Sequence, residues 1–227
     1  MNTRHHPDEA TIVAYASGTL DEGFAVVVSC HLEVCAECRS RLRTAEALGG
    51  AMMCDETETV AVSDGAFGRL LEKMSVERDA TSGSGGDKRE DGAAPQADWN
   101  VKPRALRDYL DGNLLDIKWK RVGPGIWQKP IRLSQTAESS LRLLRIAPGK
   151  SVPEHGHGGQ EITLILSGAY EDEIGYFGAG DVADLGDEIE HQPIVVSNED
   201  CICLAATEAP TRFKSIFGRL LQPWVGI

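Results

Sequence analysis

The sequence has no apolar run that approaches the roughly 20 residues needed by a membrane-spanning helix. Its first ten residues, MNTRHHPDEA, are polar and lack the apolar core of a secretory signal. We therefore expect a cytoplasmic protein with no signal peptide and no transmembrane segment. Thiols in that compartment are mostly reduced, so clusters among the 6 cysteines indicate metal or redox chemistry more than structural disulfides.

Basic residues are also scarce, with 23 Lys and Arg against 35 Asp and Glu and a net charge of −12. This balance argues against direct binding to nucleic acid, because phosphate contacts need Lys and Arg. The acidity is concentrated before residue 80, where the sequence contains 14 acidic and 7 basic residues. Such a surface suits a basic protein partner, although solubility alone would also explain it.

Composition divides the chain into three segments. Residues 79–98, DATSGSGGDKREDGAAPQAD, hold no aromatic or branched aliphatic residue and are predicted to form a flexible linker. Residues 1–78 are predicted to form a small helical domain, and residues 99–227 a separate domain of strands. A helical domain of about 80 residues has little core of its own, so a bound metal ion would stabilise it.

The two halves differ in their hydrophobic periodicity. Before the linker, Asp8 is a predicted helix cap, and Phe67, Leu70, Leu71 and Met74 form an apolar stripe with helical spacing. That stripe could anchor the helix in a partner's groove or pack inside the domain. After the linker, short apolar runs alternate with Gly, Pro, Asn and Asp, which predicts an all-β barrel or sandwich. The expected fold class is α+β, with a helical bundle followed by a barrel.

The octapeptide HLEVCAEC, residues 31–38, carries one candidate metal group. On a helix, His31, Cys35 and Cys38 would lie within about 60° of one another and could face one ion. Zinc requires a fourth N or S ligand in a tetrahedral site, and His5 and His6 are the upstream candidates. The alternative is a cluster of three residues that simply pack together.

A second candidate metal group lies in the predicted barrel. Residues 149–168, GKSVPEHGHGGQEITLILSG, fit the first cupin motif, G-x5-H-x-H-x3-E-x6-G, at every defined position. His155 and His157 are two residues apart on an extended segment and point to the same face, and Glu161 can reach the same ion. Three His and one carboxylate would suit Zn, Fe, Mn or Ni. The alternative is a ligand-binding barrel without metal.

The second cupin motif is matched less completely. Gly180 and His191 have the expected spacing, so His191 is the predicted fourth ligand of the barrel group. The internal P-x-G is absent, with Gly186 and Glu188 in its place, and the trailing Asn is Val195. The turn around His191 is therefore expected to differ from that of most cupin enzymes.

The sequence as a whole resembles the ChrR-type zinc anti-sigma factors. The resemblance rests on RHHPDEATIVAYASGTLDE near the start, the H-x3-C-x2-C pattern that follows, and PEHGHGGQEITLILSGAYEDE in the predicted barrel. It implies that His6, rather than His5, joins His31, Cys35 and Cys38, and that zinc occupies both groups. It also implies a non-enzymatic regulator. In the family, the helical domain sequesters an extracytoplasmic-function sigma factor and the cupin-like domain senses singlet oxygen and related oxidants.

Two further hypotheses follow from the residues. The barrel could belong to a cupin oxygenase or isomerase with a fused regulatory domain, or the chain could be a metal-storage or scaffold protein.

Cys201 and Cys203, two residues apart on a predicted strand, point to the same side, where an unstrained disulfide is awkward. Core packing is their favoured role, with a redox role as the alternative.

Overall fold

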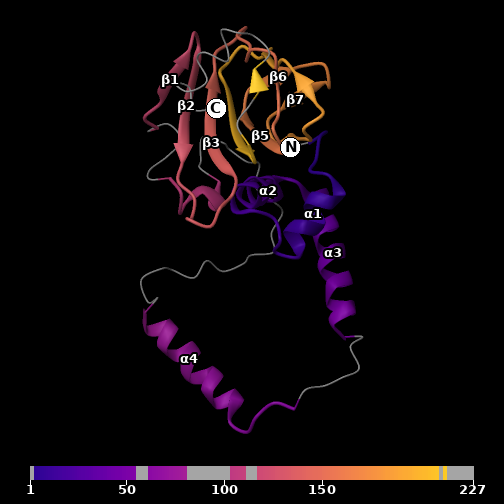
Figure 1. Cartoon of the computed structure of the whole chain (residues 1–227), viewed down its shortest axis with the longest axis vertical. Helices are drawn as coiled ribbons and strands as arrows, with labels where there is room; N and C mark the ends of the chain where they lie inside the picture. The colour runs from indigo at the N-terminus through magenta and orange to yellow at the C-terminus, as the bar shows by residue number, and fades with distance from the viewer. Residues whose placement is uncertain (1–2, 55–60, 81–102, 111–116, 210–211, 214–227) are drawn as a thin grey trace. The chain divides into compact units, whose positions relative to one another are not determined.

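The computed structural model describes residues 3–54, 61–80, 103–110, 117–209 and 212–213 (Figure 1). Contacts divide the chain into two compact units, one of residues 1–47 with 94–227 and the other of residues 48–93. Most of the predicted linker, residues 79–98, lies outside the described residues. The domain boundaries after residues 78 and 98 stay a prediction about which segments fold independently.

Four helices precede the strands: α1 (Glu9–Ala16), α2 (Glu22–Val34), α3 (Ala36–Cys54) and α4 (Ala66–Ala80). The predicted cap Asp8 begins α1, where its side chain accepts a hydrogen bond from the Thr11 N–H. The chain turns after α1 at Gly18, whose φ of +71° is one that glycine adopts without strain. No helix in the described parts of the chain is both long enough and apolar enough to cross a membrane.

The second half is built from antiparallel strands, preceded by a short 3-10 helix, η1 (Arg104–Leu106). The strands are β1 (Lys120–Gly123), β2 (Ile126–Ile131), β3 (Ser140–Ile146), β4 (His155–Gly156), β5 (Glu161–Ser167), β6 (Ala169–Glu171), β7 (Tyr176–Gly178), β8 (Val182–Leu185), β9 (Glu190–His191), β10 (Ile194–Val195), β11 (Cys201–Thr207) and β12 (Arg212–Phe213). They form a six-stranded sheet in the order β1-β2-β3-β11-β5-β8 and two three-stranded sheets, β10-β6-β7 and β12-β4-β9. Helices followed by an antiparallel cupin-like domain confirm the predicted fold class.

One hydrophobic cluster fills the space between the large sheet and the small sheet β10-β6-β7. Ile146, Ile165 and Cys203 contribute from the large sheet, and Tyr170 and Phe177 from the small one, all buried. This cluster is the interior of the barrel.

A second cluster lies on the outer face of the large sheet and is completed by α2. Val27 and Cys30 of α2 are fully buried in it together with Leu143, Leu164 and Leu204 of the sheet. Because both faces of β5 are covered, its sequence EITLILS is a nearly continuous apolar run instead of an alternating one. The helix that carries His31 and the barrel therefore share one core.

Two acidic residues at the start of α2 extend this contact. Asp21 caps α2 at Gly23 and accepts hydrogen bonds from the backbone N–H groups of Glu138 and Ser139 and from the Ser139 hydroxyl. Glu22 accepts from the Ser134 N–H and the Tyr109 hydroxyl. Burial raises the pKa of Asp21, but these hydrogen bonds outweigh it and hold the pKa below its ordinary value. The helix is thus joined to the barrel by apolar and charged contacts.

Candidate metal centres

The structure brings His6, His31, Cys35 and Cys38 together, with ligand atoms that all lie within 4.8 Å of one another. His31 Nε2 lies 3.2 Å from Cys38 Sγ. His6 Nδ1 lies 3.4 Å from Cys35 Sγ and 3.3 Å from Cys38 Sγ. His31, Cys35 and Cys38 are buried and His6 is partly buried. We call these four residues the His/Cys group.

The ligands of the His/Cys group do not share one helix, and the expectation of a single helix face was wrong. His31 is in the last turn of α2, Cys35 follows that helix with extended backbone (φ −99°, ψ 106°), and Cys38 is in the first turn of α3. The Cys35 thiol accepts a hydrogen bond from the Cys38 N–H, which would otherwise lack a partner at the start of α3. The helix break thus supplies the bend that brings the two thiols together.

The two thiols of the His/Cys group differ in their electrostatics. Burial raises the pKa of Cys35, but hydrogen bonds with His31, Thr3 and the Cys38 N–H outweigh it and bring the pKa to about 5. Burial and the neighbouring Cys35 raise the pKa of Cys38 to about 12. The first thiol is therefore a ready thiolate donor. A bound cation would supply the positive charge that the second needs to ionise.

The second set of predicted ligands, His155, His157, Glu161 and His191, also converges within 4.8 Å. We call it the barrel group. His155 and His191 pair directly across strands β4 and β9. His157 Nε2 lies 3.3 Å from His191 Nε2, and His157 Nδ1 lies 3.2 Å from Glu161 Oε2. All three imidazoles are buried and Glu161 is partly buried, so the four donors converge largely out of contact with solvent.

The protonation states of the barrel group suit a divalent cation. Burial lowers the pKa of His155 to about 4, so its imidazole is neutral at physiological pH and has a lone pair to offer. Burial raises the pKa of Glu161, but the neighbouring His157 outweighs it and holds the pKa at about 2. Three imidazoles with one carboxylate fit zinc and several transition metals, and a pair of thiols with two imidazoles fits zinc.

Four of the histidines also have an oxygen acceptor at the ring nitrogen that faces away from the group. His31 Nδ1 lies 2.9 Å from the Gly180 carbonyl oxygen, and His155 Nδ1 lies 2.9 Å from that of Pro153. His191 Nδ1 lies 2.8 Å from Asp172 Oδ2, and His6 Nε2 lies 3.5 Å from Glu37 Oε2. Outer hydrogen bonds such as the first three fix the tautomer and orientation of metal-ligating histidines, while the His6–Glu37 contact is a longer ion-pair contact. Both groups therefore have the surroundings of metal sites.

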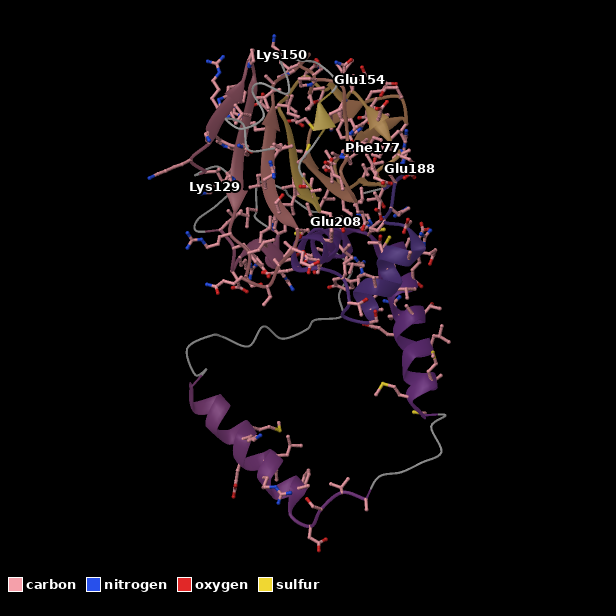
Figure 2. The ribbon with its side chains drawn as sticks, viewed as in Figure 1. Lys129, Lys150, Glu154, Phe177, Glu188 and Glu208 are labelled. Atoms are coloured by element: carbon pink, nitrogen blue, oxygen red, sulfur yellow. The ribbon has the colours of Figure 1, made fainter. Side chains whose placement is uncertain are left out.

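His5, the alternative ligand considered from the sequence, lies elsewhere. Its ring lies against the ring of Phe177 (Figure 2), with centroids 4.2 Å apart and the planes tilted by 30°. Cys201 and Cys203 are buried in the barrel interior with their sulfur atoms 3.6 Å apart. Burial in that hydrophobic cluster agrees with a packing role for both thiols.

Sequence reasoning missed the acceptors that surround the ligands. Asp172 and Glu37 are acidic residues among many, and the Gly180 carbonyl is a backbone group with no sequence signal of its own. Gly180 was noted only for its spacing from His191. No local pattern predicted that it would lie against His31, 149 residues earlier in the chain.

The fold and the two groups define a cupin-like protein with an N-terminal helical segment that carries its own candidate metal group. Residues 112–210 match the model of the ChrR cupin-like domain family. The whole chain is 42% identical to the Anti-sigma-E factor ChrR of Cereibacter sphaeroides over 229 residues, which covers 100% of both chains. A crystal structure of Rhodobacter sphaeroides SigE in complex with the anti-sigma ChrR matches with a TM-score of 0.72 and 38% identity, over 91% of this chain and 99% of that one.

The chain therefore belongs to the ChrR family of anti-sigma factors. This is a family of regulatory proteins rather than enzymes, which argues against the oxygenase hypothesis.

Proposed function

We propose that the protein binds an extracytoplasmic-function sigma factor in the cytoplasm and withholds it from RNA polymerase. Its family membership supports this function, since one relative is named an anti-sigma factor and a similar chain was crystallised with SigE. In the proposal, zinc occupies the His/Cys group and the barrel group. Singlet oxygen or a related oxidant acts on the barrel and causes release of the sigma factor.

The observation that carries the proposal is the apolar surface of the second half of α3 and of α4. The predicted stripe on α4 is uncovered, with Phe67 72% exposed and Leu70, Leu71 and Met74 each at least 50% exposed. At the end of α3, Leu48, Met52 and Met53 are each more than 60% exposed. Exposed apolar side chains in this number on two helices are typical of partner-binding segments.

This surface has the form of a helix that binds in a partner's groove. Phe67, Leu70, Leu71 and Met74 recur at helical spacing on one face, and full burial of each contributes about 1.5–3 kcal/mol to association. Packing inside the chain is the alternative raised by the sequence, and loss of partner binding on substitution of the stripe separates the two. The acidic residues of the N-terminal segment would complement a basic sigma factor.

The test is co-purification of the full-length chain with the extracytoplasmic-function sigma factor of the same organism. The double variant Phe67→Ser, Leu71→Ser should lose at least about 2 kcal/mol of binding free energy, about a 30-fold rise in Kd. Lys73→Ser, on the same helix but outside the stripe, is the matched control and should bind like the wild type. Equal binding by wild type and double variant would refute the proposed surface.

Metal analysis and oxidant exposure test the remainder of the proposal. The purified chain should contain about two zinc ions. Illumination with a singlet-oxygen photosensitiser should release the sigma factor from the wild-type complex and leave the His155→Ala complex intact. Iron in the barrel together with turnover of a small molecule would contradict the regulatory function.

A further inference from the structure

The His/Cys group is held in part by a turn of the barrel. The turn between β7 and β8 contains Gly180, whose buried carbonyl oxygen lies 2.9 Å from His31 Nδ1. If His31 Nε2 faces an ion, Nδ1 carries the proton and donates it to this carbonyl. Gly180 has a φ of +94°, a conformation that favours glycine. The barrel therefore supplies the hydrogen-bond acceptor that orients a ligand on α2.

The residue after Gly180 holds both this turn and the start of the chain. Asp181 is only 4% exposed, and its Oδ2 accepts a hydrogen bond from the Gly178 N–H at 3.0 Å, across the turn. Its Oδ1 accepts from the backbone N–H groups of Arg4, at 2.6 Å, and His5, at 3.2 Å. The Val182 N–H donates to the His5 carbonyl at 3.2 Å. One buried carboxylate thus fixes the backbone immediately before His6.

We infer that Asp181 is a positioning residue for the His/Cys group, acting from the barrel through His31 and His6. It touches neither ligand side chain. It holds the turn that presents the Gly180 carbonyl to His31, and it holds residues 4 and 5 so that His6 reaches the two thiols. The inference rests on metal binding by the His/Cys group, which is part of the proposed function.

Strand β8 follows this turn and extends to the barrel group. β8 pairs with β5 so that Leu185 lies opposite Glu161, a ligand of the barrel group. Asp184 Oδ1 accepts a hydrogen bond from Gln160 Nε2 at 2.8 Å, and Asp184 Oδ2 accepts one from the Thr11 hydroxyl at 2.7 Å. One end of β8 therefore adjoins the His/Cys group and the other the barrel group. Metal binding at one group should consequently change the metal affinity of the other.

Cobalt titration of the full-length, metal-free chain tests the positioning role. Of the two groups, only the His/Cys group contains cysteines, so near-ultraviolet thiolate-to-cobalt charge transfer reports Co²⁺ bound there. Visible ligand-field bands report Co²⁺ bound at either group. Asp181→Asn should raise the Co²⁺ dissociation constant of the His/Cys group by about 10–100-fold. The barrel group should change by no more than the coupling between the two groups, about 5-fold. Asp108→Asn makes the same substitution at an exposed site and should match the wild type.

The outcomes separate this inference from the proposed function. Absence of charge transfer in the wild type would overturn metal binding by the His/Cys group, and the inference with it. Normal charge transfer with equal affinity in Asp181→Asn would overturn the positioning role alone. Equal weakening at both groups would also overturn it, since Asp181 would then only support the barrel fold.

A double-variant cycle tests the connection through β8. His191→Ala, which removes a barrel ligand, should weaken Co²⁺ binding by the His/Cys group about 5-fold or more in the wild-type background. The effect should be much smaller in the Asp181→Asn background, where the turn no longer transmits it. An effect of the same size in both backgrounds, or none in either, would show that β8 does not connect the two groups.

Discussion

At the scale of single residues, the two groups owe their chemistry to neighbours that touch the ligands from outside. Asp172 is the clearest case in the barrel. Its Oδ2 lies 2.8 Å from His191 Nδ1, while its Oδ1 accepts hydrogen bonds from the N–H groups of Ile174 and Gly175. Burial raises the pKa of Asp172, but these hydrogen bonds, that of His191 first, outweigh it and keep the carboxyl ionised. The carboxylate is thus well placed to fix the tautomer of His191.

We predict that Asp172→Asn weakens metal binding by the barrel group about 10–100-fold, because His191 loses its charged acceptor. Competition with a chromogenic zinc chelator measures the change. Glu171→Gln is the matched control, since it neutralises an exposed carboxylate one residue earlier. Unchanged zinc affinity in Asp172→Asn would show that the backbone alone orients His191.

At the scale of elements, α2 is the part of the helical segment most firmly tied to the barrel. Its apolar face is buried against β3, β5 and β11, and its first turn is joined to residues 134–139 by Asp21 and Glu22. Hydrogen bonds from Ser134, together with the Tyr109 hydroxyl, hold the pKa of Glu22 below its ordinary value, as those from Ser139 do for Asp21. Each carboxylate therefore binds its partners better when ionised.

This lowering of the pKa gives the contact a defined pH dependence. A carboxyl group whose pKa is lower in the folded state contributes stability that is fully present above its unfolded-state pKa of about 4 and is lost as the pH falls through the folded-state pKa. The double variant Asp21→Asn, Glu22→Gln should cost about 1–2 kcal/mol at about pH 7, from the weakened helix cap and the lost charges. The stability difference between the variant and the wild type should shrink as the pH falls below about 4.

Urea denaturation at a series of pH values measures both stabilities. Acid also protonates the metal ligands, so the difference between wild type and variant, rather than the wild-type curve alone, isolates Asp21 and Glu22. A stability difference that stays constant from neutral to acid pH would contradict the prediction.

At the scale of the whole molecule, the candidate sensor barrel and the first two helices are one compact unit. Val27 and Cys30 of α2 are fully buried in the same cluster as Leu164 and Leu204 of the sheet. Packed contacts therefore connect the barrel to the helix that carries His31 without crossing the predicted linker. The exposed apolar side chains on α4 belong to the other compact unit, residues 48–93.

Because the core is shared, we predict that α2 and the barrel unfold together. Leu164→Ala should destabilise this unit by about 2–5 kcal/mol, and hydrogen exchange should accelerate to the same extent in α2 and β5. Leu70→Ala on α4, where the side chain is 53% exposed, should change stability by less than about 0.5 kcal/mol. Faster exchange in β5 with unchanged protection of α2 would show that the helix is stable without the barrel.

Much of the architecture could be predicted from local sequence patterns. Asp8 predicted the cap of α1, helical spacing predicted the stripe on α4, and short apolar runs between turn residues predicted a domain of strands. The Cys and His spacings predicted both candidate ligand sets except for His6, which the family resemblance selected over His5. These features depend on residues close together in the chain, or on motifs whose spacing reflects a constant local geometry.

The sequence by itself determined which residues could be ligands and which segments would be helix or strand. The tertiary structure alone decided which barrel residues lie beside the His/Cys group. Asp181 holds backbone groups 176 and 177 residues away, and Gly180 meets His31 across 149 residues. Periodicity carries no information about such pairs, because each depends on where α2 packs on the barrel. That packing follows from the whole buried core and not from any one segment.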